Sequence, residues 1–416
     1  MKEKIKNIAM QAKVAGLALG CATGKTRSTF LKMAPLALEA VRNDVLEANA
    51  LDIKEAEEKG IPPAFIERLR LTEKTFEYMK KRLIEVADLP DPIGKILDGH
   101  ISETGLDVKR VSVPLGVIGI IYEARPNVTT DAAAVCIKSG NAVILRGGKE
   151  AARTNKVLAD AMIQAAKNAG LPDHSIQLFE IPGHEAVNEL LKQDQYIDVI
   201  IPRGGKNLIK AISRESRIPV IKHYDGICQM YIAEDADFDM AVDLVLNSKL
   251  DRVEVCNSLE SLLINKKIAD DFLPIIGKRL KDNDVEIRGC MTTCKLLKYA
   301  TEATEYDWST EYLDRILSVK VLDNIDCAIE HINKYGSGHT DVIVSSSKKN
   351  IDNFINRVDS ASVMVNASTR LSGGGAYGLG SVVGISTGKL HARGPVGPDE
   401  LTSYKWIAIG DGHLRK

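Results

Sequence analysis

The chain has 416 residues, of which 44% are apolar and 27% charged, a composition typical of a soluble globular protein with two or three domains. Its 55 Lys and Arg residues nearly cancel its 56 Asp and Glu residues. A protein that binds nucleic acid generally needs an excess of basic residues, so this balance excludes a nucleic-acid partner.

No stretch of the sequence is apolar enough for a membrane helix or a signal peptide. The longest apolar stretch, residues 113–122, contains Pro114 and two glycines, and it is much shorter than the roughly 20 residues that a membrane helix needs. Residues 1–16 are charged and amphipathic. Seven cysteines, an odd number spread irregularly, fit reduced thiols better than a disulfide framework. We therefore expect a cytoplasmic protein with no membrane segment.

The first 97 residues favour helices. Residues 29–50 and 72–87 carry apolar side chains at three- and four-residue spacing, the pattern of an amphipathic helix. Residues 98–116 then combine turn residues with alternating polarity, which predicts a β-hairpin.

From residue 114 onward, short apolar runs alternate with helical patterns. The strand candidates are residues 116–122, 142–145, 176–181, 196–201, 219–222 and 229–232. Helical patterns cover residues 130–139, 150–169 and 185–192. This alternation predicts a parallel sheet with helices on both faces.

A second α/β stretch follows, from about residue 235 to residue 365. Its strand candidates are residues 261–265, 315–322, 341–345 and 362–366. A glycine-rich segment, 372–397, and a last strand candidate, 402–410, complete the chain.

Two glycine-rich stretches match nucleotide-binding motifs only in part. A P-loop is approximated by GCATGKT (20–26), but one residue is missing between its glycines and no strand precedes it. A G-x-G-x-x-G occurs in GGGAYGLG (373–380), without the helix that should begin at its third glycine. We predict a turn between helices for the first and a lining loop for the second.

Two other loops share one sequence and one position in the predicted sheet. Each follows a strand and precedes a helix, and together they contribute Arg146, Gly147, Gly148 and Lys149, and Arg203, Gly204 and Gly205. The glycines let a ligand approach the backbone, and the helix N-terminus offers free N–H groups to a phosphate. Arg and Lys add positive charge, which suits the 2′-phosphate of NADP. We expect an NADPH or NADP site here; two basic surface turns are the alternative.

Among the seven cysteines, Cys256 has the context of a nucleophile. It lies after a charged loop and before the apolar run 259–264, and loops at strand ends often carry catalytic residues. The alternative is a small core residue, which is the interpretation we give to Cys228. Cys290 and Cys294 have no second pair of ligands at zinc spacing, so we expect no metal.

Several segments together resemble the gamma-glutamyl phosphate reductase (glutamate-5-semialdehyde dehydrogenase) family of the aldehyde dehydrogenase superfamily. The resemblance runs over nearly the whole chain. It includes VPLGVIGIIYEARPNVTTDAAAVCIKSGNAVILRGGKEA (113–151), IPRGGKNLI (201–209), VCNSLESLLI (255–264), YDWSTEYLDRIL (306–317), YGSGHTD (335–341), VNASTR (365–370) and KLHARGPVG (389–397).

The resemblance implies an α/β, aldehyde dehydrogenase-like fold in three parts. A Rossmann-like NADP-binding domain would comprise residues 1–97, 114–232 and 380–403, and an α/β catalytic domain residues 233–379. A small β oligomerisation element would combine residues 98–113 with residues 404–416. It would make the protein a homo-oligomer, dimer or tetramer.

The resemblance also implies NADPH-dependent reduction of L-glutamyl 5-phosphate to L-glutamate 5-semialdehyde, the second step of proline biosynthesis. Cys256 matches the nucleophile that forms a thioester, and Asn127 matches the side chain that holds the oxyanion. Glu311 matches the glutamate on the nicotinamide ribose, and Arg146 and Lys149 match the adenosine-ribose side. The alternatives are a turn residue for Asn127 and an exposed helix-end charge for Glu311.

The same family suggests Ser368, Arg370 and His391 as substrate-binding residues. The chain departs from the family where it has Gln229 instead of histidine, Val253 instead of proline, and Gly373 and Val382 instead of carboxylates. A carboxylate is the natural partner of a substrate ammonium group. Two alternatives therefore stay open: a paralogue that reduces a different acyl phosphate, and a non-catalytic subunit that organises the glutamate kinase.

Aldehyde dehydrogenases that hydrolyse their thioester use a glutamate in a Glu-Leu-Gly-Gly segment. The corresponding stretch here, residues 223–226, reads His-Tyr-Asp-Gly. Without that glutamate, the resemblance implies that phosphate rather than water resolves the thioester. It also suggests association with glutamate 5-kinase as a partner beyond the small-molecule substrate.

Overall fold

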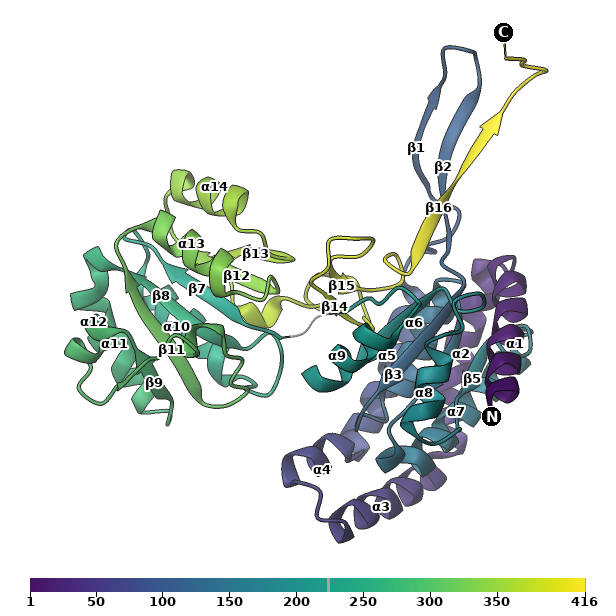
Figure 1. The fold of residues 1–416 in the computed structure, drawn as a ribbon, viewed down its shortest axis with the longest axis horizontal. Helices are drawn as coiled ribbons and strands as arrows, with labels where there is room; N and C mark the ends of the chain where they lie inside the picture. Colours follow the sequence, from purple (N-terminus) through teal and green to yellow (C-terminus); the bar gives the residue numbers. More distant parts are fainter. Residues whose placement is uncertain (223–224, 416) are drawn as a thin grey trace. The chain divides into compact units, whose positions relative to one another are not determined.

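The computed structural model describes residues 1–222 and 225–415, which form two compact units. The first contains residues 1–222, 378–384 and 396–415, and the second contains residues 225–377 and 385–395. Each unit has its own parallel sheet (Figure 1). The range predicted for the cofactor domain differs from the first unit at two places. Residues 225–232 lie in the second unit, and the range 380–403 is divided, because residues 385–395 pack with the second unit.

The first unit is built on a four-stranded parallel sheet in the order β5-β4-β3-β6. Its strands are β3 (Val117–Tyr122), β4 (Ala142–Arg146), β5 (Ile176–Leu178) and β6 (Val199–Arg203). Every residue of β3 is buried, as expected for a central strand covered on both faces. The predicted strand 219–222 is wrong: it forms only an isolated bridge from Val220 to Ile200, and Pro219 has no N–H to donate to a ladder.

Helices cover both faces of this sheet. They are α1 (Lys2–Gly20), α2 (Gly24–Ala40), α3 (Arg42–Glu58), α4 (Pro63–Leu69), α5 (Glu73–Asp88), α6 (Val128–Lys138), the 3-10 turn η1 (Lys149–Ala151), α7 (Ala152–Asn168), α8 (His184–Leu190) and α9 (Lys206–Glu215). The helical pattern at residues 29–50 belongs to two helices, since the chain turns at Val41. Residues 20–26 form the predicted turn between helices, where the Thr23 side chain caps α2.

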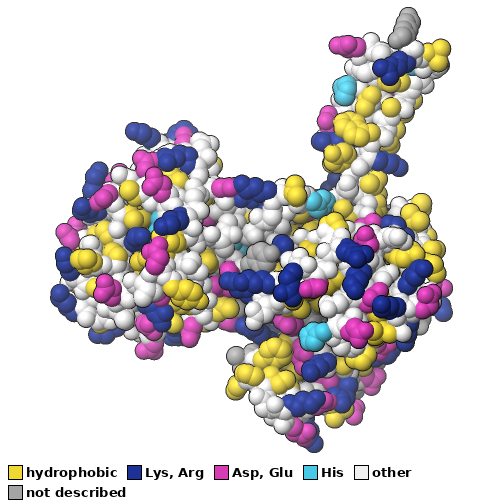
Figure 2. All heavy atoms as spheres, in the orientation of Figure 1, with side chains coloured by type: hydrophobic (Ala, Val, Ile, Leu, Met, Phe, Trp, Pro, Cys, Tyr) yellow, Lys and Arg dark blue, Asp and Glu magenta, His cyan; other side chains and the backbone are white. Residues whose placement is uncertain are grey.

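The predicted hairpin is present and gains a third strand from the C-terminal region. β1 (Ile96–Ile101), β2 (Asp107–Pro114) and β16 (Thr402–Ile409) form an antiparallel sheet in the order β1-β2-β16. Its surface carries exposed apolar side chains (Figure 2), among them Ile96, Ile101, Tyr404, Trp406 and Ile409. An exposed apolar surface of this kind is typical of an interaction site.

The second unit is built on a parallel sheet in the order β10-β9-β11-β8-β7-β12-β13. Its strands are β7 (Cys228–Ile232), β8 (Leu259–Asn265), β9 (Glu286–Gly289), β10 (Thr301–Glu302), β11 (Ile316–Leu322), β12 (Thr340–Val344) and β13 (Ser362–Val365). Its helical segments are α10 (Phe238–Leu250), η2 (Lys266–Ile268), α11 (Ala269–Lys281), α12 (Met291–Leu296), η3 (Asp307–Ser309), α13 (Ile325–Tyr335), α14 (Lys348–Arg357) and η4 (Thr369–Leu371). The short strands β14 (Gly384–Ser386) and β15 (Gly394–Val396) pair where the chain passes between the units.

Alternating residues of the central strands pack into two different hydrophobic cores of the second unit. Met230, Leu262 and Val342 join the cluster that includes α10 and α11. Tyr231 and Leu263 join the cluster that includes α13 and α14. The loops at the strand ends are therefore attached to a sheet that is packed on both faces.

No helix in the described part of the chain is long and apolar enough to cross a membrane.

Candidate functional site

The two Arg-Gly-Gly-Lys loops of the first unit lie on either side of one strand end. β4 and β6 both pair with β3 in parallel, in registers that place Arg146 opposite Ile121 and Arg203 opposite Tyr122. One loop leads through η1 into α7, and the other leads directly into α9. Both loops therefore leave the same carboxyl edge of the sheet, as their sequence predicted.

The glycines of these loops lie close against neighbouring side chains. A Cβ at Gly147 would overlap the side chain of Asn155, and a Cβ at Gly204 would overlap the Glu123 carboxylate. A Cβ at Gly148 would overlap Glu150. The backbone of both loops thus runs close to side chains that a larger residue would displace.

Cations and carboxylates both lie at this edge. Arg146 is half-buried; burial lowers the pKa of its guanidinium, and its buried Nε has no hydrogen-bond partner among the described residues. Lys149 is exposed. The Glu123 carboxylate accepts a hydrogen bond from the Gly205 N–H (2.9 Å), and the Glu150 carboxylate accepts one from the Ala124 N–H (2.8 Å). The two carboxylates therefore fix the backbones at this edge.

Asn127 lies at the same edge, where the chain leaves β3 and enters α6. Its side-chain Nδ2 donates to the Asp131 carboxylate (3.1 Å), and its backbone carbonyl accepts from the Thr130 hydroxyl (2.9 Å). Asp131 is half-buried, and desolvation raises the pKa of its carboxyl. The side chain of Asn127 is therefore held in one orientation by α6, and one of its two amide hydrogens is engaged.

In the second unit, the candidate residues gather at the opposite edge of a sheet. Cys256 lies just before β8, and Glu311 lies in the loop before β11. Gly226 and His339 lie just before β7 and β12. Since these four strands are parallel and adjacent, all four residues lie at the amino edge.

Gly226 connects Cys256 to Glu311. A Cβ at Gly226 would overlap the carbonyl of Cys256, so the two backbones are in direct contact. The Gly226 N–H donates to Oε1 of Glu311 (2.9 Å). The structure thus brings together two predicted residues that are far apart in sequence, through the last residue of the stretch 223–226, for which no contact with either residue was predicted. Glu311 is half-buried in a loop, so the alternative of an exposed helix-end charge is wrong.

A buried thiol lies beneath the Cys256 backbone. The Cys228 Sγ donates to the Cys256 carbonyl (3.3 Å) and lies 3.7 Å from Nδ1 of His339. Burial raises the pKa of Cys228 well above its usual value and lowers the pKa of His339 to about 4. Cys228 is therefore a protonated core thiol, as predicted, whereas Cys256 is partly exposed.

The three predicted substrate residues have different surroundings. Ser368 is buried and its hydroxyl lies 3.0 Å from the Ser248 hydroxyl. The Arg370 guanidinium donates to Asp251 (2.9 Å) and to the side chain of Asn257, the residue after Cys256. His391 is exposed and has a left-handed backbone (φ 66°). The structure therefore connects Arg370 to the Cys256 loop and places Ser368 inside the unit.

Gln229 is one of the positions where the resemblance predicts a different residue. It is fully buried on β7, and neither atom of its amide has a hydrogen-bond partner among the residues described. It lies between Ser261 and Asp341 in the sheet register, and burial raises the pKa of Asp341 to about 7. Two further predicted departures, Gly373 and Val382, are partly exposed.

All seven cysteines are free thiols. Within residues 1–222 and 225–415, no group of three or more His, Cys, Asp and Glu side chains could hold a metal ion.

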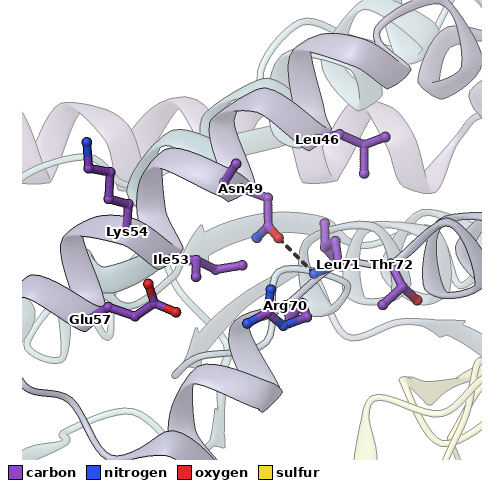
Figure 3. Close-up of a pocket in the computed structure, with 9 residues that line it drawn as sticks. Leu46, Asn49, Ile53, Lys54, Glu57, Arg70, Leu71 and Thr72 are labelled. Carbon is purple, nitrogen blue, oxygen red and sulfur yellow. Dashed lines mark hydrogen bonds between the residues drawn. The ribbon is translucent and has the colours of Figure 1, made fainter.

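A pocket of about 530 Å³ lies elsewhere in the first unit, between α3 and residues 70–72 (Figure 3). Asn49 closes one side of it, because its Oδ1 accepts from the Leu71 N–H (2.8 Å). Lys54, Glu57 and Arg70 line its rim. None of the predicted site residues lines this pocket, so it is separate from the two strand edges.

Comparison with known proteins gives a consistent relationship over the whole chain. A model of the aldehyde dehydrogenase family matches residues 2–292. The gamma-glutamyl phosphate reductase of Moorella thermoacetica is 46% identical over 418 residues, covering 99% of this chain and 100% of that protein.

Solved structures give the same relationship. The gamma-glutamyl phosphate reductase of Thermotoga maritima is 40% identical, with a TM-score of 0.96, over 99% of this chain and 100% of that one. The enzyme of that name from Saccharomyces cerevisiae is 32% identical, with a TM-score of 0.55, over 99% and 98% of the two chains. An acetylating aldehyde dehydrogenase from Geobacillus thermoglucosidasius, 22% identical with a TM-score of 0.70 over 100% and 98%, shares the fold.

Proposed function

This chain belongs to the aldehyde dehydrogenase family, and on that basis we propose that it reduces L-glutamyl 5-phosphate to L-glutamate 5-semialdehyde with NADPH and releases phosphate. The observation that carries this proposal is the joint placement of Cys256, Gly226 and Glu311 at one strand edge. The full-length likeness to gamma-glutamyl phosphate reductases supports the substrate. The reaction would be the second step of proline biosynthesis, in the cytoplasm.

Cys256 is the proposed nucleophile. Its thiolate would attack the acyl carbon, forming a C–S bond as the C–O bond to phosphate breaks, so that phosphate leaves and a thioester remains. When bound, NADPH supplies the hydride that reduces this thioester. Collapse of the reduced adduct would break the C–S bond, release the aldehyde and return the thiolate.

Asn127 is the proposed side-chain donor to the developing oxyanion, together with the Cys256 N–H. One such donor is typically worth about 3 kcal/mol of barrier. The hydrogen bond from Asn127 to Asp131 supports this role, because a fixed amide pays no reorganisation cost during the reaction.

The residues at the first strand edge fit a phosphorylated nucleotide. Arg146, Lys149 and Arg203 would supply positive charge, and Gly147, Gly148, Gly204 and Gly205 would admit the ligand to the backbone. The buried Arg146 Nε without a described partner is the kind of donor that a phosphate or ribose oxygen would satisfy. We propose NADP rather than NAD, since two cationic loops suit a 2′-phosphate. Glu311 would hold the nicotinamide ribose.

Phosphate, not water, should resolve the thioester in the reverse direction. Of the stretch that would carry an activating glutamate, His223 and Tyr224 lie outside the described residues. The adjacent Asp225 is partly exposed. The missing glutamate supports phosphate as the acceptor.

The antiparallel sheet β1-β2-β16 is the proposed contact for a homo-oligomer, a dimer or tetramer. Its exposed apolar side chains support this assignment, since burying them against a second copy removes apolar surface from water. Glutamate 5-kinase is the further partner that we propose.

The reverse reaction tests this function. Wild type and Cys256→Ser are incubated with glutamate semialdehyde, NADP and phosphate, and NADPH formation is followed by absorbance. Phosphate-dependent NADPH formation that is lost in the variant is expected. Equal turnover without phosphate would show that the reductase assignment is wrong.

A second candidate function keeps the chemistry and changes the acyl phosphate. The unpaired amide of buried Gln229, together with Gly373 and Val382 where the family has carboxylates, favours it. Turnover with other aldehydes, and none with glutamate semialdehyde, would support this alternative. No turnover with any aldehyde would support a non-catalytic role.

A further inference from the structure

A buried ion pair closes the base of the loop that carries Cys256. Lys249 lies in the last turn of α10 and Glu260 near the start of β8, and their side chains meet at 2.8 Å with exposures of 0% and 1%. The segment between them, residues 251–258, is the Cys256 loop. Because the pair joins the two ends of this loop, the ends cannot separate without disturbing two desolvated charges.

The same carboxylate also holds the loop that carries Glu311. While Oε2 of Glu260 accepts from Lys249, its Oε1 accepts from the Leu313 N–H (3.2 Å). Leu313 has a left-handed backbone (φ 54°), which a leucine adopts only when its surroundings enforce it. Residues 310–315 form the Glu311 loop, and Leu313 lies two residues beyond Glu311.

The remaining contacts of the Glu311 loop fix its other side. The Tyr312 hydroxyl lies 2.9 Å from the Asp307 carboxylate and 2.8 Å from the Ser318 hydroxyl on β11. Asp307 is itself paired with Arg288 at 2.9 Å. The loop is therefore held at Tyr312 from the sheet and at Leu313 from Glu260, and Glu311 lies directly before both.

A buried ion pair is a weak source of stability. Removing two charges from water costs about as much as their attraction returns, and apolar replacements of such pairs are often neutral or stabilising. Breaking a buried pair on one side is destabilising, since it leaves a charge without a partner. The pair at Lys249 and Glu260 is therefore better explained by the two loops that it joins than by the stability of the unit.

We propose that Lys249 and Glu260 are positioning residues, which hold the Cys256 loop and the Glu311 loop in a fixed relation to each other. The ion pair between Lys249 and Glu260 would fix the position of the Cys256 loop. The hydrogen bond from the Leu313 N–H to Glu260 would fix the position of Glu311. The second half of this inference rests on the proposed role of Glu311 in binding NADPH, whereas the first half does not.

The test replaces the pair with apolar residues in the full-length protein, as the double variant Lys249→Met/Glu260→Leu. Three quantities are measured: the urea midpoint of unfolding, the rate at which iodoacetamide alkylates Cys256, followed by peptide mass spectrometry, and the Kd for NADPH. We expect an unchanged or raised urea midpoint, together with changes of at least fivefold in both the alkylation rate and the Kd. An unchanged rate and Kd in a folded double variant would overturn the proposal.

A conservative single variant separates the two contacts, and its urea midpoint is measured alongside to show that it is folded, because breaking the pair on one side is destabilising. Glu260→Gln removes the charge that pairs with Lys249 but keeps an oxygen for the Leu313 N–H. We expect the alkylation rate to change at least threefold while the Kd for NADPH stays within twofold. No change in the alkylation rate would contradict the proposal, as would an equal loss in the two readouts.

The matched control is the exposed pair of the same unit, Lys266 and Asp323, which lie 2.9 Å apart with 70% and 69% exposure. The double variant Lys266→Met/Asp323→Leu should leave the alkylation rate and the Kd unchanged. If wild type fails to convert glutamate semialdehyde with phosphate, the proposed function fails. The alkylation readout still decides whether Lys249 and Glu260 position Cys256.

Discussion

The two parallel sheets present their candidate residues at opposite edges. In the first unit, Asn127 and the two Arg-Gly-Gly-Lys loops follow the carboxyl ends of strands. In the second unit, Cys256 and Glu311 precede the amino ends of β8 and β11. A carboxyl edge leads into helix N-termini, whose free N–H groups suit a phosphorylated ligand.

An amino edge offers no such groups, because its loops arrive from the C-terminal ends of helices such as α10 and α13. There the structure uses side chains and close backbone contacts instead: Gly226 against Cys256, and Glu260 against Leu313. The carboxyl edge of the first unit is therefore suited to ligand binding through the backbone. The other is suited to holding a few side chains in fixed positions.

The largest effect should come from Gly226→Ala, because the new Cβ would overlap the Cys256 carbonyl. A displacement of about 1 Å at a reacting group can cost roughly 100-fold in rate, so kcat/KM should fall by about that factor or more. Steady-state kinetics with glutamate semialdehyde measure it. Gly388→Ala is the control, since its nearest neighbour is the Ser386 hydroxyl at 3.5 Å. Unchanged kcat/KM in Gly226→Ala would mean that a displacement of the Cys256 backbone does not slow the reaction.

The next largest effect should be confined to the carboxyl edge of the first unit and leave the amino edge of the second unit unchanged. In Gly147→Ala, the added Cβ would overlap Asn155, which accepts a hydrogen bond from the Thr129 hydroxyl (3.1 Å). The Kd for NADPH should rise about tenfold, equal to about 1.4 kcal/mol, whereas Cys256 alkylation by iodoacetamide should stay within twofold. Gly20→Ala, with an ordinary neighbour at 3.6 Å, is the control. A parallel loss of alkylation would show that the edges are not independent.

How far the sequence predicts this molecule depends on the kind of signal. Continuous apolar runs predicted the buried strands β3, β6 and β8 correctly, because a parallel strand covered on both faces needs an apolar side chain at nearly every position. The strands β9 and β10 were missed, since they are short and partly exposed. The aldehyde dehydrogenase-like fold that the resemblance implied is confirmed.

The candidate site shows the same limit. The pair of Arg-Gly-Gly-Lys loops was visible as a local pattern, and Cys256 and Glu311 were found through the resemblance. Gly226 was visible only as the last residue of the stretch 223–226, and its contact with Cys256 was not predicted, because it arises from packing against a residue 30 positions away. The contact from Glu260 to Leu313 likewise joins residues 53 positions apart. Contacts of this range depend on the sheet order, which no spacing along the chain specifies.

A smaller effect should be on the free energy of unfolding at low pH. Among the described residues, the buried histidines are His331 and His339, and both lie in the second unit. Burial lowers the pKa of His331 to about 3 from 6.5, and the Lys320 ammonium beside it acts in the same direction. Its folded pKa is depressed, so its contribution to stability is complete above pH 6.5 and is lost as pH falls toward 3. Between pH 7.5 and pH 5, the loss should be about 2 kcal/mol.

His331→Gln should remove this acid dependence. The difference in free energy of unfolding between wild type and variant should therefore shrink by about 2 kcal/mol from pH 7.5 to pH 5, as measured by urea denaturation. His184→Gln in the first unit is the control, because His184 is exposed. Equal slopes for the two variants would show that His331 protonates freely in the folded protein.

The smallest effect should come from Arg252→Ala, within the Cys256 loop itself. Arg252 pairs with Glu254 at 2.8 Å, but the two side chains are 60% and 42% exposed, so water screens their attraction. The free energy of unfolding should change by less than about 0.5 kcal/mol, and the alkylation rate of Cys256 should stay within twofold. A tenfold fall in that rate would mean that the exposed guanidinium, rather than the buried contacts beneath the loop, controls the thiol. The contrast with Lys249 and Glu260 is direct, because one pair is exposed within the loop and the other is buried at its base.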